Sequence, residues 1–328
     1  MATPAALLGH GGQLGAARTA FPAAPTPWLD LSTGINPWPY PMPNHGPEAY
    51  SRLPDPETLR SLERAAASAF GVDDPARIVA AAGSEALIRL LPRLLPARRI
   101  AVSAQTYGGH AQAWRLADAD LTDEADPSAH LRVLVNPNNP DGRVLPLAQV
   151  LALTDGLMIV DEAFAEAAPG SSAAAQAGAP GHERLIVLRS FGKFYGLAGV
   201  RLGFLVAEPR LAARVRQALG DWPVSGPALA VGLAAYADPV WAAQTRARLA
   251  ADAARLNALL ITARFEIVGG TALFRLARAA DAPRRFEALA RAGILTRPFP
   301  WDETLIRFGL PGPQADWLRL AQALETFR

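Results

Sequence analysis

The sequence predicts an α/β protein whose main sheet is mostly parallel and lies between helices. From about residue 57 onward, short apolar segments of strand length alternate with longer segments in which apolar residues recur at helical spacing. The strand-like segments are apolar almost without interruption, which is typical of strands covered on both faces. Half of the 328 residues are hydrophobic and 19% are charged, which is sufficient for a large buried core.

The expected elements can be placed in order along the first two thirds of the chain. Residues 1–56 are rich in proline and glycine, which predicts an arm or an irregular segment. The helix expected over 57–70 has apolar residues such as Leu62 and Ala66 at helical spacing and ends at Gly71. The elements expected after it are strand 77–82, helix 84–95, strand 100–102, a helix ending at 117, strand 131–135, helix 146–155, and strands 157–160, 185–188 and 204–206.

The last third of the chain predicts a second, smaller domain. Val240–Ile261 has the pattern of one long helix rich in Ala, Arg and Leu, which leads into this domain. The elements expected after it are strands 265–268 and 271–276, helix 283–292, strands 294–296 and 305–308, and a terminal helix from 314. Two strands and a helix, followed again by two strands and a helix, favour an α/β or α+β domain.

Composition excludes several classes of function. The 32 basic and 30 acidic side chains nearly cancel to a net charge of +2, and no basic block is present, so we expect no nucleic-acid binding. The chain has no cysteine, which excludes disulfides and thiolate catalysis, and its five histidines form no ligand pair, so no metal site is expected. No segment resembles a membrane span or a secretory signal; a cytoplasmic protein without a membrane partner is therefore expected.

The most informative single residue is Lys193, because every other basic residue of the chain is arginine. Arginine replaces lysine in most surface roles, but its guanidinium stays protonated and does not form an imine. The single lysine is therefore either kept for imine chemistry or left by chance in an arginine-rich composition. Lys193 follows the apolar run Leu185–Leu188 in the segment Ser190-Phe191-Gly192-Lys193, which places it just after a buried strand.

Further polar residues follow other predicted strands, where ligands gather in open α/β sheets. Ser84 begins a helix, where it is either a simple N-cap or part of an anion site. Tyr107 has a ring that can stack on a planar ligand, and Asn139 stands in a dense turn that by itself needs no ligand. Asp161 ends an apolar strand, so its buried carboxylate needs a cationic partner or hydrogen bonds.

The order and spacing of these motifs resemble the aspartate-aminotransferase-like superfamily of pyridoxal-phosphate enzymes, known as fold type I. The resemblance extends from about residue 30 to the C-terminus. The matching segments are Gly83-Ser84-Glu85, Tyr107, Asn139-Pro140-Asp141-Gly142, Asp161-Glu162-Ala163-Phe164, Ser190-Phe191-Gly192-Lys193 and Arg201-Leu202-Gly203-Phe204.

This resemblance implies a cofactor, pyridoxal 5′-phosphate, and a role for each matching residue. Lys193 binds the cofactor as an imine and later moves protons at the substrate. Asp161 pairs with the pyridinium nitrogen, Tyr107 stacks on the ring, and Asn139 bonds the 3′-oxygen. The cofactor phosphate is implied to be held by Ser84, Ser190, Arg201 and the backbone amide of Glu85.

The N-terminal region resembles a narrower family than the core motifs do. His10-Gly11-Gly12 and the segment Ser32-Thr33-Gly34-Ile35-Asn36-Pro37 resemble the opening of the L-threonine-O-3-phosphate decarboxylases of cobalamin biosynthesis, in particular their shorter, aerobic-pathway form. The resemblance implies a lyase that converts L-threonine O-3-phosphate to (R)-1-amino-2-propanol O-2-phosphate.

The same resemblance implies a set of substrate-binding residues. Arg307 is implied to grip the substrate carboxylate, for which a bidentate guanidinium is well suited. Gly34, Ile35 and His10 are the other residues implied at the substrate, and His10 and Arg143 are candidates for its phosphate.

Histidinol-phosphate aminotransferases share the core motifs and are the main alternative; a non-catalytic pyridoxal-phosphate-binding scaffold in cobalamin assembly is another. Phe164 favours the decarboxylase, because aminotransferases of this group generally have tyrosine there. Leu53 stands where the superfamily places a tyrosine that reaches the cofactor phosphate of the partner subunit, and Tyr50 lies three residues away.

The resemblance also implies a domain organisation and an assembly. Residues 1–34 are expected to form an arm that is part of the small domain, 35–238 the large cofactor-binding domain, and 239–328 the small C-terminal domain. A homodimer with active sites at the subunit interface is expected.

Overall fold

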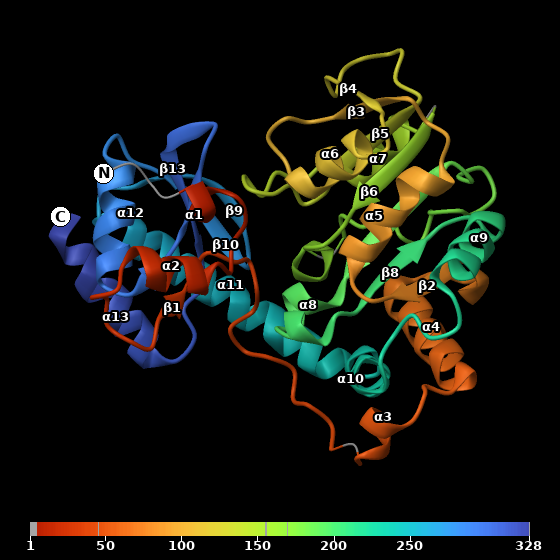
Figure 1. Ribbon diagram of the computed structural model, residues 1–328, viewed down its shortest axis with the longest axis horizontal. Helices are drawn as coiled ribbons and strands as arrows, with labels where there is room; N and C mark the ends of the chain where they lie inside the picture. The colour runs from red at the N-terminus through yellow and green to blue at the C-terminus, as the bar shows by residue number, and fades with distance from the viewer. Residues whose placement is uncertain (1–4, 45, 155, 169, 328) are drawn as a thin grey trace. The chain divides into compact units, whose positions relative to one another are not determined.

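The computed structural model describes residues 5–44, 46–154, 156–168 and 170–327, and these form two units (Figure 1). The small unit contains the residues up to 38, 140–142 and those from 244 onward. The large unit contains residues 39–139 and 143–243. The domain limits expected from the sequence stay a prediction, and each unit is described by itself.

The large unit is built around a seven-stranded sheet with helices on both faces. Its strands are β2 Ile78–Ala81, β3 Arg99–Val102, β4 Asp120–Thr122, β5 Leu131–Val135, β6 Leu157–Asp161, β7 Leu185–Ser190 and β8 Gly203–Val206. Its helices are α3 Glu48–Ser51, α4 Pro56–Phe70, α5 Ser84–Leu94, α6 Gly108–Arg115, α7 Leu147–Ala152, α8 Phe191–Phe194, α9 Pro209–Leu219 and α10 Gly226–Tyr236, with 3-10 turns at Pro75–Arg77, Ala165–Ala167 and Ala198–Val200.

The strand order is β2-β8-β7-β6-β5-β3-β4, and the sheet is mostly parallel as predicted. Only β8 runs antiparallel to both of its neighbours. The register brings strand ends from distant parts of the chain together: Asp161 stands opposite Leu188, while Gly203 stands opposite both Ser190 and Ala81. The predicted fold class is confirmed.

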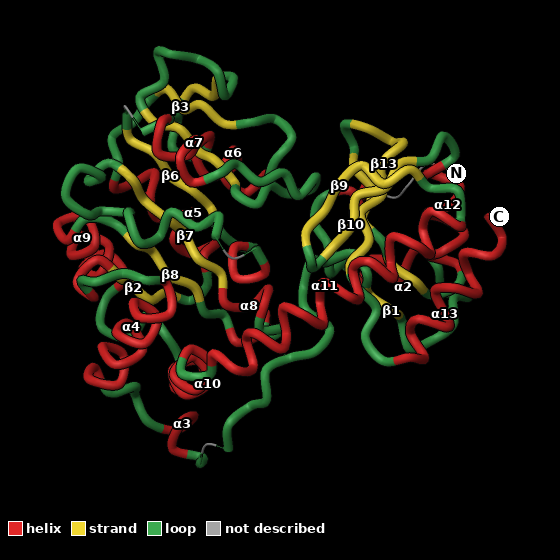
Figure 2. Tube along the Cα trace, turned by 180° about the vertical axis from the view of Figure 1, so that it is seen from behind, coloured by secondary structure: helices red, strands yellow, loops and turns green. Residues whose placement is uncertain are grey.

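Helices lie on both faces of this sheet (Figure 2). Most residues of its strands are buried, which explains their continuous apolar runs. On one face, alternate strand residues pack with α5, α6 and α9 in a core that includes Leu87, Trp114 and Val215. On the other face, α4 and α10 pack together, and the ring of Phe70 meets that of Phe204 edge-on at 5.6 Å between centroids.

The small unit contains a four-stranded antiparallel sheet in the order β12-β13-β10-β9 and a two-stranded sheet of β1 and β11. Its strands are β1 Leu29–Asp30, β9 Glu266–Thr271, β10 Phe274–Arg278, β11 Ile294–Leu295, β12 Arg297–Phe299 and β13 Asp302–Gly309. Its helices are α1 Ala5–Leu8, α2 Leu14–Ala20, α12 Ala282–Arg291, α13 Gln314–Leu324 and a final 3-10 turn Glu325–Phe327, and α11 Pro239–Thr262 contributes most of its length.

Several elements were not expected from the sequence. The N-terminal region, predicted to be irregular, contains α1, α2, β1 and α3. Strand β1 forms because its backbone pairs in parallel with β11, where Leu29 stands opposite Ile294, and no local pattern reveals such a distant partner. Helix α10 is extensively buried and is apolar on all sides. Its sequence therefore lacks the alternation of apolar and polar residues that predicts a helix.

Helix α9 and strands β4 and β12 were also missed. In α9, Pro209 at the first turn and the Glu208 side chain, which accepts hydrogen bonds from the backbone amides of Arg210 and Leu211, are recognisable start signals. Among the described helices, none combines the length and the apolar character that crossing a bilayer requires.

Candidate active site

The carboxylate of Asp161 lies at the end of β6, is 3% exposed and is held by two hydrogen bonds. The backbone N–H of Ala163 donates to Oδ1 at 3.0 Å, and His110 Nε2 lies 2.9 Å from Oδ2. His110 comes from α6, is 1% exposed, and was not singled out by the sequence analysis. These bonds offset part of the cost of keeping an anion in the core, and they fix its direction.

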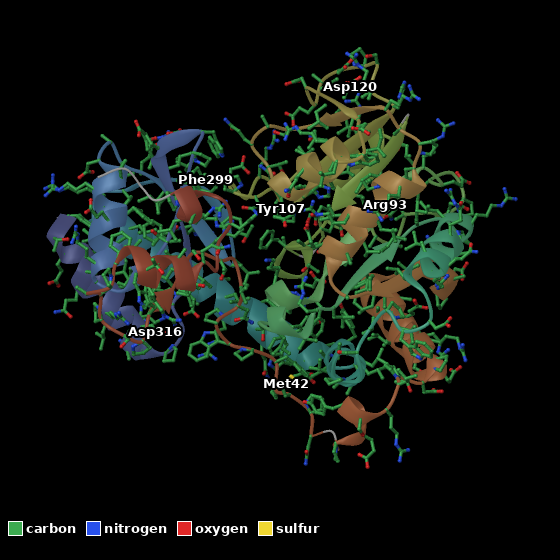
Figure 3. The ribbon with its side chains drawn as sticks, in the orientation of Figure 1. Met42, Arg93, Tyr107, Asp120, Phe299 and Asp316 are labelled. Carbon is green, nitrogen blue, oxygen red and sulfur yellow. The ribbon has the colours of Figure 1, made fainter. Side chains whose placement is uncertain are left out.

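Tyr107 stands at the start of α6 (Figure 3). Its hydroxyl donates a 2.9 Å hydrogen bond to the carboxylate of Glu85. Burial and the nearby charge of Glu85 raise the pKa of Tyr107, so the phenol stays protonated at neutral pH. The same carboxylate accepts a bond from Nε of Arg89 at 2.8 Å. The ring of Tyr107 meets that of His110 edge-on at 6.1 Å, which links it to the Asp161 carboxylate.

The start of α5 has the properties of an anion site. Ser84 is the first helical residue, and the amide N–H groups of a first helical turn have no partner within the helix. A Cβ atom on Gly83 would lie 2.7 Å from Nη2 of Arg201, which places this guanidinium beside the helix start. Gly203 pairs with Ser190 of β7, and a Cβ on Gly203 would lie 2.3 Å from the amide nitrogen of Ser84. The structure therefore brings the phosphate-binding candidates of the large unit together.

Lys193 lies in the single-turn helix α8, which directly follows β7. Phe191 and Phe194, on either side of it, have no exposed surface, and the ring of Phe191 stacks on that of Tyr195 at 4.4 Å between centroids. The lysine side chain is partly exposed. Burial of the two phenylalanines fixes the helix that carries the only lysine of the chain.

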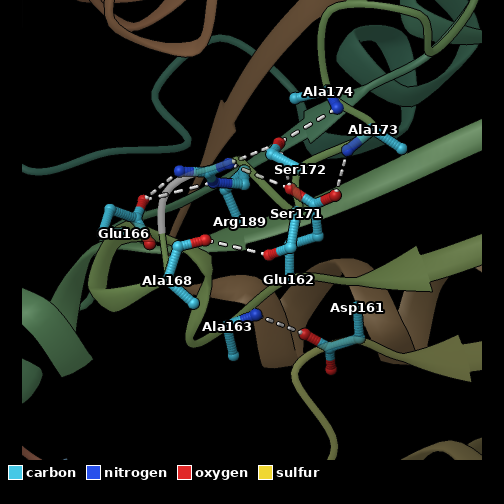
Figure 4. Close-up of polar contacts among 10 residues, drawn as sticks. All are labelled: Asp161, Glu162, Ala163, Glu166, Ala168, Ser171, Ser172, Ala173, Ala174 and Arg189. Carbon is cyan, nitrogen blue, oxygen red and sulfur yellow. Dashed lines mark hydrogen bonds and ion pairs between the residues drawn. The ribbon is translucent and has the colours of Figure 1, made fainter. Parts of the chain in front are cut away.

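Next to Asp161 in the chain, a buried cluster of charges joins the ends of β6 and β7 (Figure 4). The guanidinium of Arg189 bonds Glu162 at 2.9 Å and Glu166 at 2.8 Å, and its Nη1 donates to Oγ of Ser172 at 3.0 Å. Burial opposes its charge, yet the carboxylates of Glu166 and Glu162 raise the pKa of Arg189. Because Glu162 follows Asp161 and Arg189 precedes Ser190, the cluster fixes both loops.

Asn139 stands in the turn after β5, and its neighbours hold the base of that turn in the large unit. The side-chain amide of Asn138 donates to the carbonyl of Gln105 at 3.1 Å and accepts from the hydroxyl of Thr106 at 2.7 Å. The backbone N–H of Asn136 donates to the carbonyl of Asp161 at 2.9 Å. The turn that carries Asn139 is thus attached to the loops that carry Tyr107 and Asp161.

In the small unit, Arg307 lies on β13 and is 6% exposed. It donates to the carbonyl of Ser32 at 2.8 Å and stands opposite Arg297 in the β12–β13 ladder. Burial, together with the charge of Arg297, lowers the pKa of Arg307 to about 9, although Asp30 acts in the opposite direction. Two neighbouring arginines form a site suited to an anion, and the sequence analysis missed Arg297.

The N-terminal segment around His10 is attached to the same part of the small unit. The backbone N–H of Gly12 donates to Oγ of Ser32 at 2.7 Å, and that hydroxyl donates to Asp30 at 2.5 Å. A guanidinium nitrogen of Arg297 lies 2.5 Å from the carbonyl oxygen of Gly9. His10 is exposed, while Gly34 is buried and Ile35 is partly buried in this unit.

The remaining candidates lie in the large unit. Arg143 is 3.9 Å from Glu124, with both side chains half exposed. Phe164 is 3% exposed. Tyr50 and Leu53 are 72% and 69% exposed, so both present their side chains to solvent around α3.

The candidates for the cofactor therefore all lie in the large unit, whereas Arg307, Gly34, Ile35 and His10 lie in the small unit. His110 had a signal in the sequence, because it follows Tyr107 by three residues, which is one helical turn. Arg297 had a weaker signal, since only the β12–β13 register shows that it faces Arg307.

Comparison with known proteins agrees with this description. The family model for "Aminotransferase class I and II" matches residues 45–324. A threonine-phosphate decarboxylase of Pseudomonas aeruginosa is 41% identical over 98% of this chain and 98% of its own, and histidinol-phosphate aminotransferase 3 of Mesorhizobium japonicum is 29% identical over 88% and 85%. The structure of histidinol-phosphate aminotransferase from Sinorhizobium meliloti in complex with pyridoxal-5′-phosphate has the same fold, with a TM-score of 0.80 and 20% identity over 96% of this chain and 95% of that one.

The family model spans well over half of the chain, and the identity to the decarboxylase extends through the N-terminal region that the aminotransferase model leaves out. The chain belongs to the family of class I and II aminotransferases, and within it to the threonine-phosphate decarboxylases.

Proposed function

We propose that this protein is a pyridoxal-phosphate-dependent lyase that converts L-threonine O-3-phosphate and a proton to (R)-1-amino-2-propanol O-2-phosphate and carbon dioxide, which provides the aminopropanol linker of cobalamin. The observation that carries the proposal is the 41% identity to a threonine-phosphate decarboxylase over 98% of both chains. The buried Phe164 supports the same reaction, because it lacks the phenol that aminotransferases of this group generally have at that position.

The donor set of the large unit fits pyridoxal phosphate. Asp161 is a buried carboxylate suited to a protonated ring nitrogen, and Tyr107 offers an aromatic ring held by Glu85. The start of α5 and the adjacent Arg201 suit the phosphate, together with Ser84, Ser190 and the amide of Glu85. Asn139 would donate to the 3′-oxygen of the cofactor, and Lys193 would provide the amine for the covalent bond. Once bound, the cofactor supplies an electron sink for the electrons that a breaking bond at the substrate α-carbon releases.

The protein groups decide which of these bonds breaks. Arg307 holds the substrate carboxylate and sets its orientation. The interaction between Arg307 and the carboxylate accelerates decarboxylation only if it stabilises the transition state more than the ground state. After the carbon–carbon bond breaks, Lys193 delivers a proton to the α-carbon. Gly34, Ile35 and His10 contact the rest of the substrate. Arg297, beside Arg307, adds a second cation for a substrate that carries both a carboxylate and a phosphate.

The assembly and the location belong to the same proposal. The protein would form a homodimer with active sites at the subunit interface. The exposed side chains of Tyr50 and Leu53 near α3 would then contact the partner subunit. The large unit then corresponds to the cofactor-binding domain and the small unit to the C-terminal domain joined by the N-terminal arm. We place the protein in the cytoplasm.

The decisive experiment is incubation of the purified protein with pyridoxal phosphate and L-threonine O-3-phosphate, with carbon dioxide and the amine product both measured. A parallel reaction contains histidinol phosphate and a 2-oxo acid acceptor. Product in the first reaction alone supports the decarboxylase, and product in the second alone assigns the aminotransferase instead. Turnover in neither, with cofactor still bound, favours the non-catalytic scaffold.

A second measurement tests the covalent bond itself. Borohydride reduction of the protein with bound cofactor, followed by peptide mapping, is expected to find the label on Lys193. The Lys193→Arg variant should retain its fold and its positive charge but take up no label and show no turnover, because a guanidinium does not form the imine. A label elsewhere, or turnover by this variant, would contradict the role given to Lys193.

A further inference from the structure

The side chain of Tyr107 is fixed at both of its ends within the large unit. At one end, its backbone forms the start of α6. At the other end, its hydroxyl donates to Oε2 of Glu85 at 2.9 Å. Glu85 lies in the first turn of α5, a helix that packs on α6. Two attachment points on two packed helices leave the ring little freedom to turn about its side-chain bonds.

The carboxylate of Glu85 is itself held in one direction. Its other oxygen, Oε1, accepts from Nε of Arg89 at 2.8 Å, one turn further along α5. Nη2 of Arg89 then donates to Oε1 of Gln112, on α6, at 2.7 Å. The chain of bonds thus leads from Tyr107 through two residues of α5 and back to α6. Because both oxygens of the carboxylate are bonded, a rotation away from the hydroxyl also breaks a bond to a charged group.

The ring of Tyr107 lies against the backbone of Gly109. A Cβ atom on Gly109 would lie 2.4 Å from Cε1 and 2.8 Å from Cζ of the tyrosine, so only glycine lets the ring occupy this place. Tyr107 also packs against the core of the large unit. The contact with Gly109 limits where the ring can lie, and the bond to Glu85 holds it there.

Glu85 also affects the charge distribution of the ring. Burial and the negative charge of Glu85 raise the pKa of Tyr107, so the phenol keeps its proton and remains a donor at neutral pH. A phenol that donates to a carboxylate has a more electron-rich ring, and the face of such a ring attracts a cation. A cofactor ring whose nitrogen is protonated opposite Asp161 carries such a charge. The bond to Glu85 therefore favours stacking through both orientation and charge.

We propose that the side chain of Glu85 is a positioning residue for the cofactor: its bond to the hydroxyl sets the orientation of the Tyr107 ring that stacks on pyridoxal phosphate. The inference rests on the proposed function, because it requires this cofactor and the stacking role of Tyr107. It gives a role to the side chain of a residue from which the proposed function uses only the backbone amide.

The experiment is a double-mutant cycle of Glu85→Ala and Tyr107→Phe, in which absorbance titration measures the dissociation constant for pyridoxal phosphate. Tyr107→Phe keeps the ring and removes only the hydroxyl. Glu85→Ala should raise the constant by about tenfold in the unsubstituted protein, as expected for one hydrogen bond to a charged group. In the Tyr107→Phe background that bond is already absent, so Glu85→Ala should have a much smaller effect. Any effect of the lost charge on the cofactor phosphate is present in both backgrounds and cancels.

The visible circular dichroism of the bound cofactor is a second readout, which is independent of affinity when the cofactor is saturating. Glu85→Ala and Glu85→Asp should both weaken this band. Aspartate keeps the charge, but it is one methylene group shorter and should not reach the hydroxyl. Glu287→Ala is the matched control, because it removes the same kind of ion pair one helical turn apart, with Arg291 at 2.7 Å in α12 of the small unit. Its band and its dissociation constant should equal those of the unsubstituted protein.

Two results would overturn the inference: equal effects of Glu85→Ala in the two backgrounds, or an unchanged band in Glu85→Asp. If Glu85→Ala does not fold, Glu85→Asp takes its place in the cycle with the same expected outcome. A protein that forms no coloured adduct with pyridoxal phosphate refutes the proposed function and the inference with it. A coloured adduct combined with equal effects in the two backgrounds refutes only the role of Glu85.

Discussion

The imidazole of His110 and the carboxylate of Asp161 form a buried pair, with Nε2 2.9 Å from Oδ2 and both residues almost free of exposed surface. The pair joins the first turns of α6 to the end of β6, so the same short helix that begins at Tyr107 also orients the anion. A carboxylate with one oxygen bonded to an imidazole and the other to the Ala163 amide has its direction fixed before any ligand arrives.

Replacement of His110 by phenylalanine should weaken cofactor binding. The substitution keeps a ring in α6 but leaves Oδ2 of Asp161 buried without its donor, a change that costs about 1–3 kcal/mol. We expect the dissociation constant for pyridoxal phosphate to rise by roughly 5- to 150-fold, measured by absorbance titration. His130→Phe is the control, because His130 is exposed and should leave the constant unchanged. Equal affinity in both variants would show that the pair does not support the cofactor.

Substrate binding should weaken at alkaline pH because of Arg307. Its pKa is lowered to about 9 by burial and by Arg297, so it loses its charge as the pH rises through that value. The KM for threonine phosphate should therefore increase above pH 9. Asp30 raises the pKa of Arg307, so Asp30→Asn should move this increase to lower pH. A KM profile that is identical in the two proteins would argue against the coupling of Asp30 to Arg307.

The same shift has a consequence for stability. The folded pKa of Arg307 lies below the ordinary value of an arginine, so in the window from pH 9 up to that ordinary value the unfolded chain binds more protons at this residue than the folded chain does. The contribution of this residue to the free energy of unfolding therefore rises with pH across that window and is constant below it. Comparison of urea unfolding for the protein and for Arg307→Met across the window isolates the contribution.

Removal of the cation from the buried cluster should be strongly destabilising. Arg189→Met leaves Glu162 and Glu166 in the core without their counter-charge, and breaking a buried pair in this way costs about 3–5 kcal/mol. Urea unfolding measures the loss. Arg64→Met removes an exposed partner of Glu57 instead and should have little effect. A small loss in Arg189→Met would argue against a stabilising ion pair between Arg189 and the two glutamates.

Ser32→Ala should loosen the segment around His10 without disturbing the cofactor. It removes the acceptor for the Gly12 amide and the donor to Asp30, worth about 1 kcal/mol in a typical case. We expect kcat/KM for threonine phosphate to fall by roughly 5-fold or more, while the cofactor absorbance stays the same. Ser128→Ala, at an exposed turn with a similar bond to Asp126, is the matched control. A changed cofactor spectrum would show that the substitution also disturbs the cofactor site, against this prediction.

Much of the fold followed from local patterns. Helix α4 was expected to within one residue, because Leu62, Ala66 and the terminating Gly71 are signals carried by the segment itself. Strand β5 was expected with its correct limits for the same reason: a continuous apolar run stops at a dense turn. Strand β1 was missed, since its two residues are a strand only through their pairing with β11.

By itself, the sequence determined the family, the α/β class and the positions at which polar residues follow buried strands, because these depend on composition, periodicity and spacing. The partners of those residues were decided only by the tertiary structure: His110 at Asp161, and Arg297 beside Arg307. The physical reason is that hydrogen bonds, like-charge pairs and backbone contacts act over a few ångströms, and strand register and chain packing alone bring such distant residues within that range.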